Sequence, residues 1–178
     1  MGARAACALV LALLPATQGL PAPRVWLGPA LALDPAFAAA TIGADLFFTP
    51  SAAVGVSAAH TFAGAGDRTA VESGYGFLSL LGRLRPALDD DYSVELFAGA
   101  GLGLVRFGTP GAHRELAPDV TLGAALGLPL PHRLELALEL GTHVTFSAAA
   151  AARNPAHTSE LLTVALRWGG PRQSKRNR

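Results

Sequence analysis

The segment His132–Ser147 alternates between apolar side chains and polar or small ones along most of its length. Because successive side chains of a β-strand point to opposite faces, this pattern predicts a strand with one apolar and one polar face. A strand in a soluble protein averages about five or six residues, whereas a tilted strand that crosses a membrane needs about 9–11. The length of the alternation therefore favours a membrane-crossing strand.

The same period of two residues recurs along the rest of the chain and predicts seven further strands. Glycines lie inside the apolar runs, and each disfavours a helix by about 1 kcal/mol relative to alanine. The expected strands are 24–34, 37–48, 52–62, 70–85, 92–107, 118–129 and 158–168, in addition to 132–147.

The connections between these segments tend to alternate in length. Those at 49–51, 86–91 and 131–132 are shorter or tighter than those at 64–69, 108–117 and 148–157, although the first long position, 34–36, is itself short. Transmembrane barrels combine short periplasmic turns with longer outer loops and an even number of strands. The pattern indicates an up-and-down barrel with both termini on the periplasmic side.

The apolar faces carry almost no charge, and the polar faces are rich in glycine and alanine. A sheet in lipid must close on itself, because open edges would leave backbone groups without hydrogen bonds. The predicted fold is therefore all-β, an eight-stranded antiparallel up-and-down transmembrane β-barrel. Aromatic residues near strand ends are expected at the membrane interfaces, namely Trp26, Phe47, Phe48, Tyr92, Phe107, Phe146 and Trp168.

The two ends of the chain differ from its centre. Arg4 precedes the apolar run Ala5–Leu14, and Pro15 and small residues follow, which is the order of a secretory signal peptide. The run is too short for a spanning helix of roughly 20 residues. We expect a signal peptide at 1–19, cleaved after Gly19 or Ala22, a barrel at 20–168 and a basic disordered tail at 169–178.

With the signal peptide, the eight alternating segments and the closing strand SELLTVALRW, the chain resembles the small bacterial outer-membrane β-barrels of the OmpA/OmpX type. The resemblance implies the outer membrane of a Gram-negative bacterium and contact with outer-membrane lipid. It also implies a terminal strand signal read by the barrel assembly machinery, at Leu162, Val164, Leu166 and Trp168. Such barrels usually end at this aromatic residue, whereas here GGPRQSKRNR follows.

Charged residues on the polar faces are expected to form a network inside the barrel, because buried charges must be paired or solvated. Expected contacts are Arg83 with Glu95, and Arg167 with Glu135 or Glu139. A lumen filled by such a network would conduct ions and solutes poorly. The alternative is that the barrel is a narrow or gated channel. The expected lumen residues are Asp45, Arg83, Glu95, Asp119, Arg133, Glu135, Glu139, His143 and Arg167.

No residue pattern predicts a catalytic, metal or cofactor site. His143 and Ser147 are separated by about 13 Å on an extended strand, beyond hydrogen-bond reach. The five histidines lack ligand spacing, and the glycines of Gly99–Gly103 continue a strand where a phosphate loop would open a helix. The only cysteine, Cys7, lies in the signal segment.

Charge argues against a nucleic-acid partner. The formal net charge is +1, and the basic residues of the tail conceal a body that is net acidic, whereas nucleic-acid binding requires a basic folded surface.

Three hypotheses for the function remain. The leading hypothesis is a non-enzymatic outer-membrane barrel with a structural or surface-binding role and at most a narrow channel, whose surface ligand the sequence does not identify. The alternatives are a lipid-modifying enzyme at the outer rim and a soluble periplasmic ligand-binding barrel.

Overall fold

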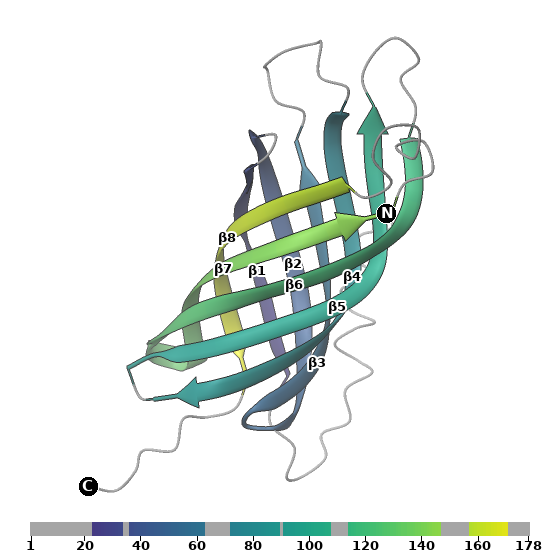
Figure 1. Ribbon diagram of the computed structural model, residues 1–178. Coiled ribbons are helices and arrows are strands. Elements are labelled where there is room, and N and C mark those ends of the chain that lie inside the picture. Colours follow the sequence, from purple (N-terminus) through teal and green to yellow (C-terminus); the bar gives the residue numbers. More distant parts are fainter. Residues whose placement is uncertain are drawn as a thin grey trace, which may run out of the picture.

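The computed structural model describes residues 23–33, 36–62, 72–89, 91–107, 114–146 and 157–170. Within these ranges, eight antiparallel strands form one closed barrel, in which each strand pairs with its neighbours in sequence (Figure 1). No helix in this part of the chain is long and apolar enough to cross a membrane. The elements are β1 (Arg24–Leu33), β2 (Ala36–Thr49), β3 (Ala52–Thr61), β4 (Glu72–Leu88), β5 (Ser93–Phe107), β6 (Arg114–Leu130), the 3-10 turn η1 (Pro131–Arg133), β7 (Leu134–Thr145) and β8 (His157–Gly169).

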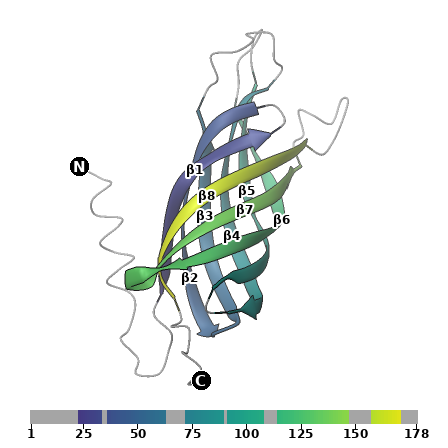
Figure 2. The same ribbon diagram turned by 90° about the vertical axis from the view of Figure 1, so that its left-hand side faces the viewer.

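The barrel closes where β8 lies between β7 and β1 (Figure 2). Leu166 of β8 pairs with Leu136 on one side and with Leu27 on the other. Closure gives each of the eight described strands a paired neighbour on both sides, so the sheet has no open edge strand.

The register sets the width of the barrel. Steps between paired residues lead from Arg24 on β1 around the barrel to Ser159 on β8. Leu161 pairs with Ala32 on β1, which is eight residues after Arg24. Ser159 precedes Leu161 by two residues on the antiparallel strand β8, so it lies level with a position two residues after Ala32. The path therefore climbs ten residues per circuit, which corresponds to a strand tilt of roughly 40° and a backbone radius of roughly 8 Å.

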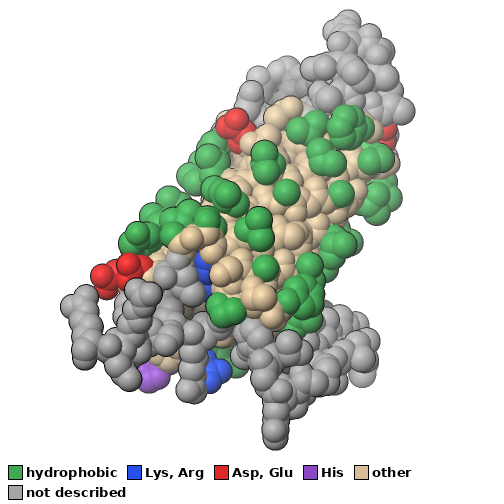
Figure 3. Space-filling model, turned by 60° about the horizontal axis from the view of Figure 1, so that its bottom comes forward, with side chains coloured by type: hydrophobic (Ala, Val, Ile, Leu, Met, Phe, Trp, Pro, Cys, Tyr) green, Lys and Arg blue, Asp and Glu red, His purple; other side chains and the backbone are tan. Residues whose placement is uncertain are grey.

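The strands turn their apolar faces outward. Leu122, near the middle of β6, is 68% exposed, and large apolar side chains of all eight strands are exposed with it, among them Ile42 on β2 and leucines or valines on the other strands. Hydrophobic side chains are spread over the barrel wall in the space-filling view (Figure 3). A soluble ligand-binding barrel requires the opposite arrangement, with the apolar face inside, so the structure argues against that alternative.

Several predicted strand limits were wrong by a few residues. The strand predicted at His132–Ser147 begins two residues before β7. Pro131–Arg133 form a 3-10 turn, in which His132 and Arg133 both have φ of 62°, so the strand starts only at Leu134. Four residues assigned to the loop at 108–117, Arg114–Ala117, belong to β6. The signal segment 1–19, the connection 64–69 and Ser147 lie outside the described residues.

Two of the predicted interface aromatics lie inside the barrel. Trp26 is 5% exposed and Phe47 is 1% exposed, because they share the inward faces of their strands with Arg24 and Asp45. A position near a strand end does not specify the face. Among the described residues, the exposed aromatics are Phe48, Tyr92 and Trp168 near the end of the barrel where β1 begins and β8 ends (the termini of the barrel), and Phe62 and Phe146 near the opposite end; the side chain of Phe107 is not described.

We expect Leu122→Arg to destabilise the barrel in a lipid bilayer by about 2–4 kcal/mol, because a charge at mid-wall must enter hydrocarbon. The measurement is the free energy of unfolding from urea titration in lipid vesicles. Glu160→Arg, at an exposed position near the end of β8 away from the termini, is the control and should cost less than about 1 kcal/mol. Equal effects of the two changes would contradict a lipid-facing wall.

Candidate functional site

The half of the lumen nearer the termini holds a cluster of buried charges, which we call the ion-pair cluster. Its members come from six of the eight strands. Four guanidinium groups face four carboxylates, so the cluster as a whole carries no net charge. It consists of Arg24, Arg83, Arg85 and Arg167 with Asp45, Glu95, Glu135 and Glu139.

Arg24 joins three walls of the barrel at the start of β1. Its Nε and Nη2 donate to Asp45 Oδ2 on β2 at 2.9 and 2.8 Å. Its Nη1 and Nη2 donate to the two carboxylate oxygens of Glu95 on β5 at 2.5 and 2.9 Å. The guanidinium is therefore shared between two carboxylates, in the planar geometry that makes arginine pairs strong.

Arg83 on β4 reaches into the middle of the lumen. Its Nε donates to Asp45 Oδ1 at 3.0 Å, and its Nη2 lies 3.5 Å from Glu139 Oε2. The guanidinium carbon is 5.4 Å from the ring centroid of Trp26 and 4.9 Å from that of Phe97. Aromatic faces attract cations at this range. The Arg83 guanidinium is therefore held in place both by the carboxylates and by the two rings.

The two remaining arginines complete the cluster. Arg85 donates from Nε and Nη2 to Glu95 Oε1 at 3.0 and 2.6 Å. Arg167 on β8 donates to Glu135 Oε1 at 2.6 Å and also to Glu139 Oε1. The lumen at this level is thus filled by paired side chains.

Inward glycines make room for the inward aromatic rings. Gly43 pairs with Trp26, and a Cβ there would lie 2.3 Å from the indole. Gly123 pairs with Phe97, and a Cβ there would lie 2.3 Å from the Phe97 ring. The glycines therefore allow each ring to lie against the neighbouring strand, which keeps it in reach of Arg83.

The other half of the lumen has a smaller polar group. Asp119 Oδ2 lies 3.0 Å from His143 Nδ1, and Thr145 Oγ1 donates to Asp119 Oδ1 at 3.0 Å. The His143 ring stacks on Phe77 of the opposite wall, with centroids 3.9 Å apart and planes at 18°. This stack spans the lumen and forms a second constriction, in addition to the one made by the ion-pair cluster.

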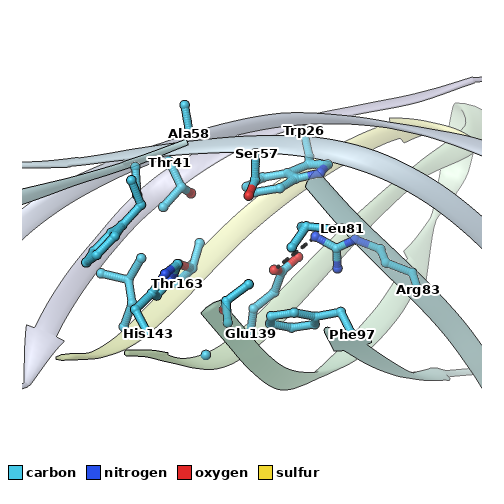
Figure 4. Close-up of a pocket in the computed structure, with 15 residues that line it drawn as sticks. Trp26, Thr41, Ser57, Ala58, Leu81, Arg83, Phe97, Glu139, His143 and Thr163 are labelled. Atoms are coloured by element: carbon cyan, nitrogen blue, oxygen red, sulfur yellow. Dashed lines mark hydrogen bonds and ion pairs between the residues drawn. The ribbon is translucent and has the colours of Figure 1, made fainter. Parts of the chain in front are cut away.

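A cavity of about 30 Å³ lies between the two narrow levels. Trp26, Arg83, Glu139 and His143 are among the side chains that surround it (Figure 4). Sites for organic ligands measure roughly 300–1,000 Å³, so this cavity has room only for very small molecules. The described lumen is thus a filled interior.

Eight of the nine predicted lumen residues lie inside the barrel. The exception is Arg133, which is exposed in η1; the prediction was wrong because the alternation was extended through the turn. Arg83 Nη1 lies 3.5 Å from Glu95 Oε2, while Arg167 contacts both glutamates named as its alternatives.

Sequence reasoning missed Arg24 and Arg85. Arg85 is two residues from Arg83 and hence on the same face, so the period of two could have found it. Arg24 shares its face with Trp26, and the expected place of Trp26 at the membrane interface gave no reason to put that face in the lumen.

A metal centre is not assembled in the part of the chain that the structure describes. No group of three potential metal ligands occurs among these residues. His143 has its Nδ1 against Asp119 and is buried. Ser147, the nucleophile considered for it, lies outside the described residues.

Comparison with known proteins identifies the fold, and it does so through structure alone. No family model and no curated sequence matches the chain. The N-terminal β-barrel domain of Pseudomonas aeruginosa OprF is similar over 85% of this chain and 100% of that one, with a TM-score of 0.62 and 11% identity. Neisserial surface protein A is similar over 83% and 95%, with a TM-score of 0.60 and 9% identity.

A third solved structure is Ail, the attachment invasion locus protein of Yersinia pestis, in complex with the heparin analogue sucrose octasulfate. It is similar over 84% of this chain and 99% of that one, with a TM-score of 0.53 and 14% identity. The fold is that of an eight-stranded outer-membrane β-barrel. It matches the small OmpA/OmpX-type barrels that the sequence resembles.

We expect Arg83→Met to lower the free energy of unfolding by about 3–5 kcal/mol, because it removes one cation from a neutral cluster and leaves a negative charge uncompensated among the buried carboxylates. The double variant Arg83→Met/Glu139→Gln should recover part of this loss, since it removes one charge of each sign. Arg133→Met is the matched control at an exposed arginine and should be close to neutral. Urea titration in micelles measures all three, and a neutral Arg83→Met would contradict the described pairing.

Proposed function

We propose that the protein is a non-enzymatic barrel of the outer membrane of a Gram-negative bacterium, with a closed lumen and a structural or surface-binding role. The observation that carries this proposal is the neutral ion-pair cluster, which draws on six strands and fills the lumen. A barrel filled in this way is a rigid scaffold, and any channel through it is narrow.

The dimensions of the wall support a place in a bilayer. A ten-residue strand tilted by roughly 40° rises roughly 25 Å, which is the height of the apolar band of outer-membrane barrels. Exposed aromatics occur toward both ends of the wall, where membrane interfaces lie. Outer-membrane lipid is thus the proposed partner of the outer face.

The closing strand supports recognition by the barrel assembly machinery. Val164, Leu166 and Trp168 are exposed on the outer face of β8, and Leu162, half-buried, shares that face. Directly after Trp168, Gly169 and Gly170 have φ of 96° and 84°, a region that glycine adopts without strain. The regular strand backbone therefore gives way to positive φ directly after the aromatic residue, although the sequence continues beyond it.

A surface-binding role would fall to the connections at the end away from the termini. These connections, 63–71, 108–113 and 147–156, join β3 to β4, β5 to β6 and β7 to β8, and they lie outside the described residues. Segments that join strands of a rigid scaffold commonly carry binding.

The alternative of a lipid-modifying enzyme has less support. A general base must reach the substrate, and His143, the candidate base, is buried in the lumen against Phe77 and Asp119. Lipid surrounds the outer face, so this histidine does not meet it.

Tryptophan fluorescence tests the membrane location. In vesicles with brominated acyl chains, Trp168, which is 57% exposed on the wall, should be strongly quenched, whereas Trp26 in the lumen should be little affected. The variants Trp26→Phe and Trp168→Phe separate the two signals, and the gel-mobility shift on boiling verifies that each is folded. Equal quenching of both residues would contradict the orientation of the strands in lipid.

Planar-bilayer conductance tests the closed lumen. The native barrel should give no steady current above the bare membrane, because paired charges fill the passage. Arg83→Ala/Glu139→Ala removes one charge of each sign and much side-chain volume, so its conductance should rise several-fold. Leu138→Ala, on the outer face, is the control. A large steady conductance of the native protein would refute the closed scaffold and favour a pore.

A further inference from the structure

The turn between β6 and β7 has a backbone conformation that its residues seldom adopt. The N–H of Leu134 donates to the carbonyl oxygen of Pro131, so His132 and Arg133 are the two central residues of a tight turn. Both have φ of 62°, in the left-handed region that disfavours residues with a side chain. Hairpin turns with positive φ at both central positions normally carry Asn-Gly or a similar pair. The needs of the fold therefore do not explain a histidine and an arginine at this turn.

Both side chains of the turn are free to meet a ligand from outside the chain. His132 and Arg133 are exposed, and neither has a hydrogen-bond or ion-pair partner among the described residues. Backbone strain that no internal contact compensates is commonly found at functional sites. The strained turn and its unpaired side chains together indicate that the turn presents these two groups to a partner.

The turn lies at the edge of the apolar wall. Leu134 pairs with Trp168 near the end of β8, so Arg133 is beside the exposed indole of that residue. Leu130 and Leu136, one on each side of the turn, are exposed on the same wall. Tryptophan occurs where the hydrocarbon of a bilayer meets the headgroups. The turn therefore lies at the level of lipid headgroups.

The charge of this end of the barrel differs from turn to turn. The connection from β4 to β5 exposes Asp89 and Asp91, the one from β2 to β3 exposes uncharged residues at 49–51, and η1 exposes His132 and Arg133. Acidic and basic side chains accordingly occupy different places at the end that comes forward in Figure 3. An anionic headgroup is thus attracted to the side of the barrel that holds η1.

We propose that η1 and Trp168 form a binding site for the phosphate of an anionic phospholipid, an inference that rests on the membrane location proposed above. The planar guanidinium of Arg133 offers two parallel N–H donors to phosphate oxygens, and the His132 ring offers a further N–H. Trp168 packs against the lipid at the interface. A zwitterionic lipid carries the same phosphate, but its ammonium group cancels the charge, so the site favours the anionic lipid.

The end of the chain brings further positive charge to the same place. Beyond Gly170 the sequence contains Arg172, Lys175, Arg176 and Arg178. This segment follows β8, whose last residues are adjacent to the start of β7. Basic residues close to a membrane surface add to the attraction of anionic lipid. The proposed site is formed by η1 and Trp168, and the added charge strengthens it.

Quenching of Trp168 by brominated lipids measures the preference, in a Trp26→Phe background that leaves one tryptophan. The full chain is placed in vesicles of phosphatidylcholine and phosphatidylglycerol in equal amounts, with bromine on the acyl chains of one lipid or the other. Brominated phosphatidylglycerol should quench more strongly, with a several-fold higher binding constant at Trp168. Equal quenching by the two lipids would overturn the site alone, whereas no quenching by either lipid would refute the membrane location.

The variant His132→Asn/Arg133→Gly separates lipid binding from folding, because it supplies the pair that this backbone favours and removes both ligand side chains. The preference for phosphatidylglycerol should disappear, while the urea midpoint in phosphatidylcholine vesicles should stay the same or rise. Asp91→Asn, a change of charge at the turn between β4 and β5, is the control and should leave the preference unchanged.

Deletion of residues 171–178 tests the alternative that the basic segment alone attracts the lipid. The shortened chain should keep a reduced preference for phosphatidylglycerol, because η1 and Trp168 are intact. A preference that vanishes with this deletion, or that persists in His132→Asn/Arg133→Gly, would contradict the assignment to η1. The shortened chain decides the question even if the double variant does not fold.

Discussion

Four buried guanidinium groups and four carboxylates can coexist in this lumen only if every charge finds an opposite charge within reach. Removing an ion from water costs several kcal/mol even after relaxation of the protein. That requirement ties the strands together, because Arg24 needs Asp45 and Glu95 from other walls, and Arg83 needs Asp45 and Glu139. The strand register, the inward glycines and the inward aromatic rings together keep these charged side chains within reach of one another.

The apolar exterior and the charged interior are two results of one alternation. A wall that presents leucine to lipid must present its other residues to the lumen, and a lumen of roughly 8 Å backbone radius has little space for solvent. Polar residues placed there have to satisfy one another.

Alternation made most of the fold predictable from the sequence, because His132–Ser147 and similar segments assign a face to every residue once the strand is recognised. It failed where local geometry broke the period. At η1, His132 and Arg133 adopt positive φ. Arg133 is therefore exposed in the turn, and its predicted position in the lumen was wrong. Trp26 and Phe47 show a second limit, because an aromatic residue near a strand end satisfies the rule for a membrane interface and the rule for a lumen equally well.

The cluster itself was only partly predictable. Pairs such as Arg167 with Glu135 follow from adjacent strands, where the register places them opposite each other. The contact of Arg24 with Glu95 joins β1 to β5 across the lumen, and no pairwise pattern in the sequence contains it. Such contacts depend on the shear of the barrel, which sets which levels of distant strands face each other.

The strict alternation also governs which changes of length the chain can tolerate. Loss of one residue at the start of β5 would reverse the two faces of the rest of the strand, because every later position would move to the opposite side of the wall. Glu95 would then be offered to hydrocarbon and Leu96 to the lumen, although the composition would hardly change. Loss of two residues would keep the faces and move only the level, so evolution of such a barrel should proceed by even steps inside strands and by free steps in the connections.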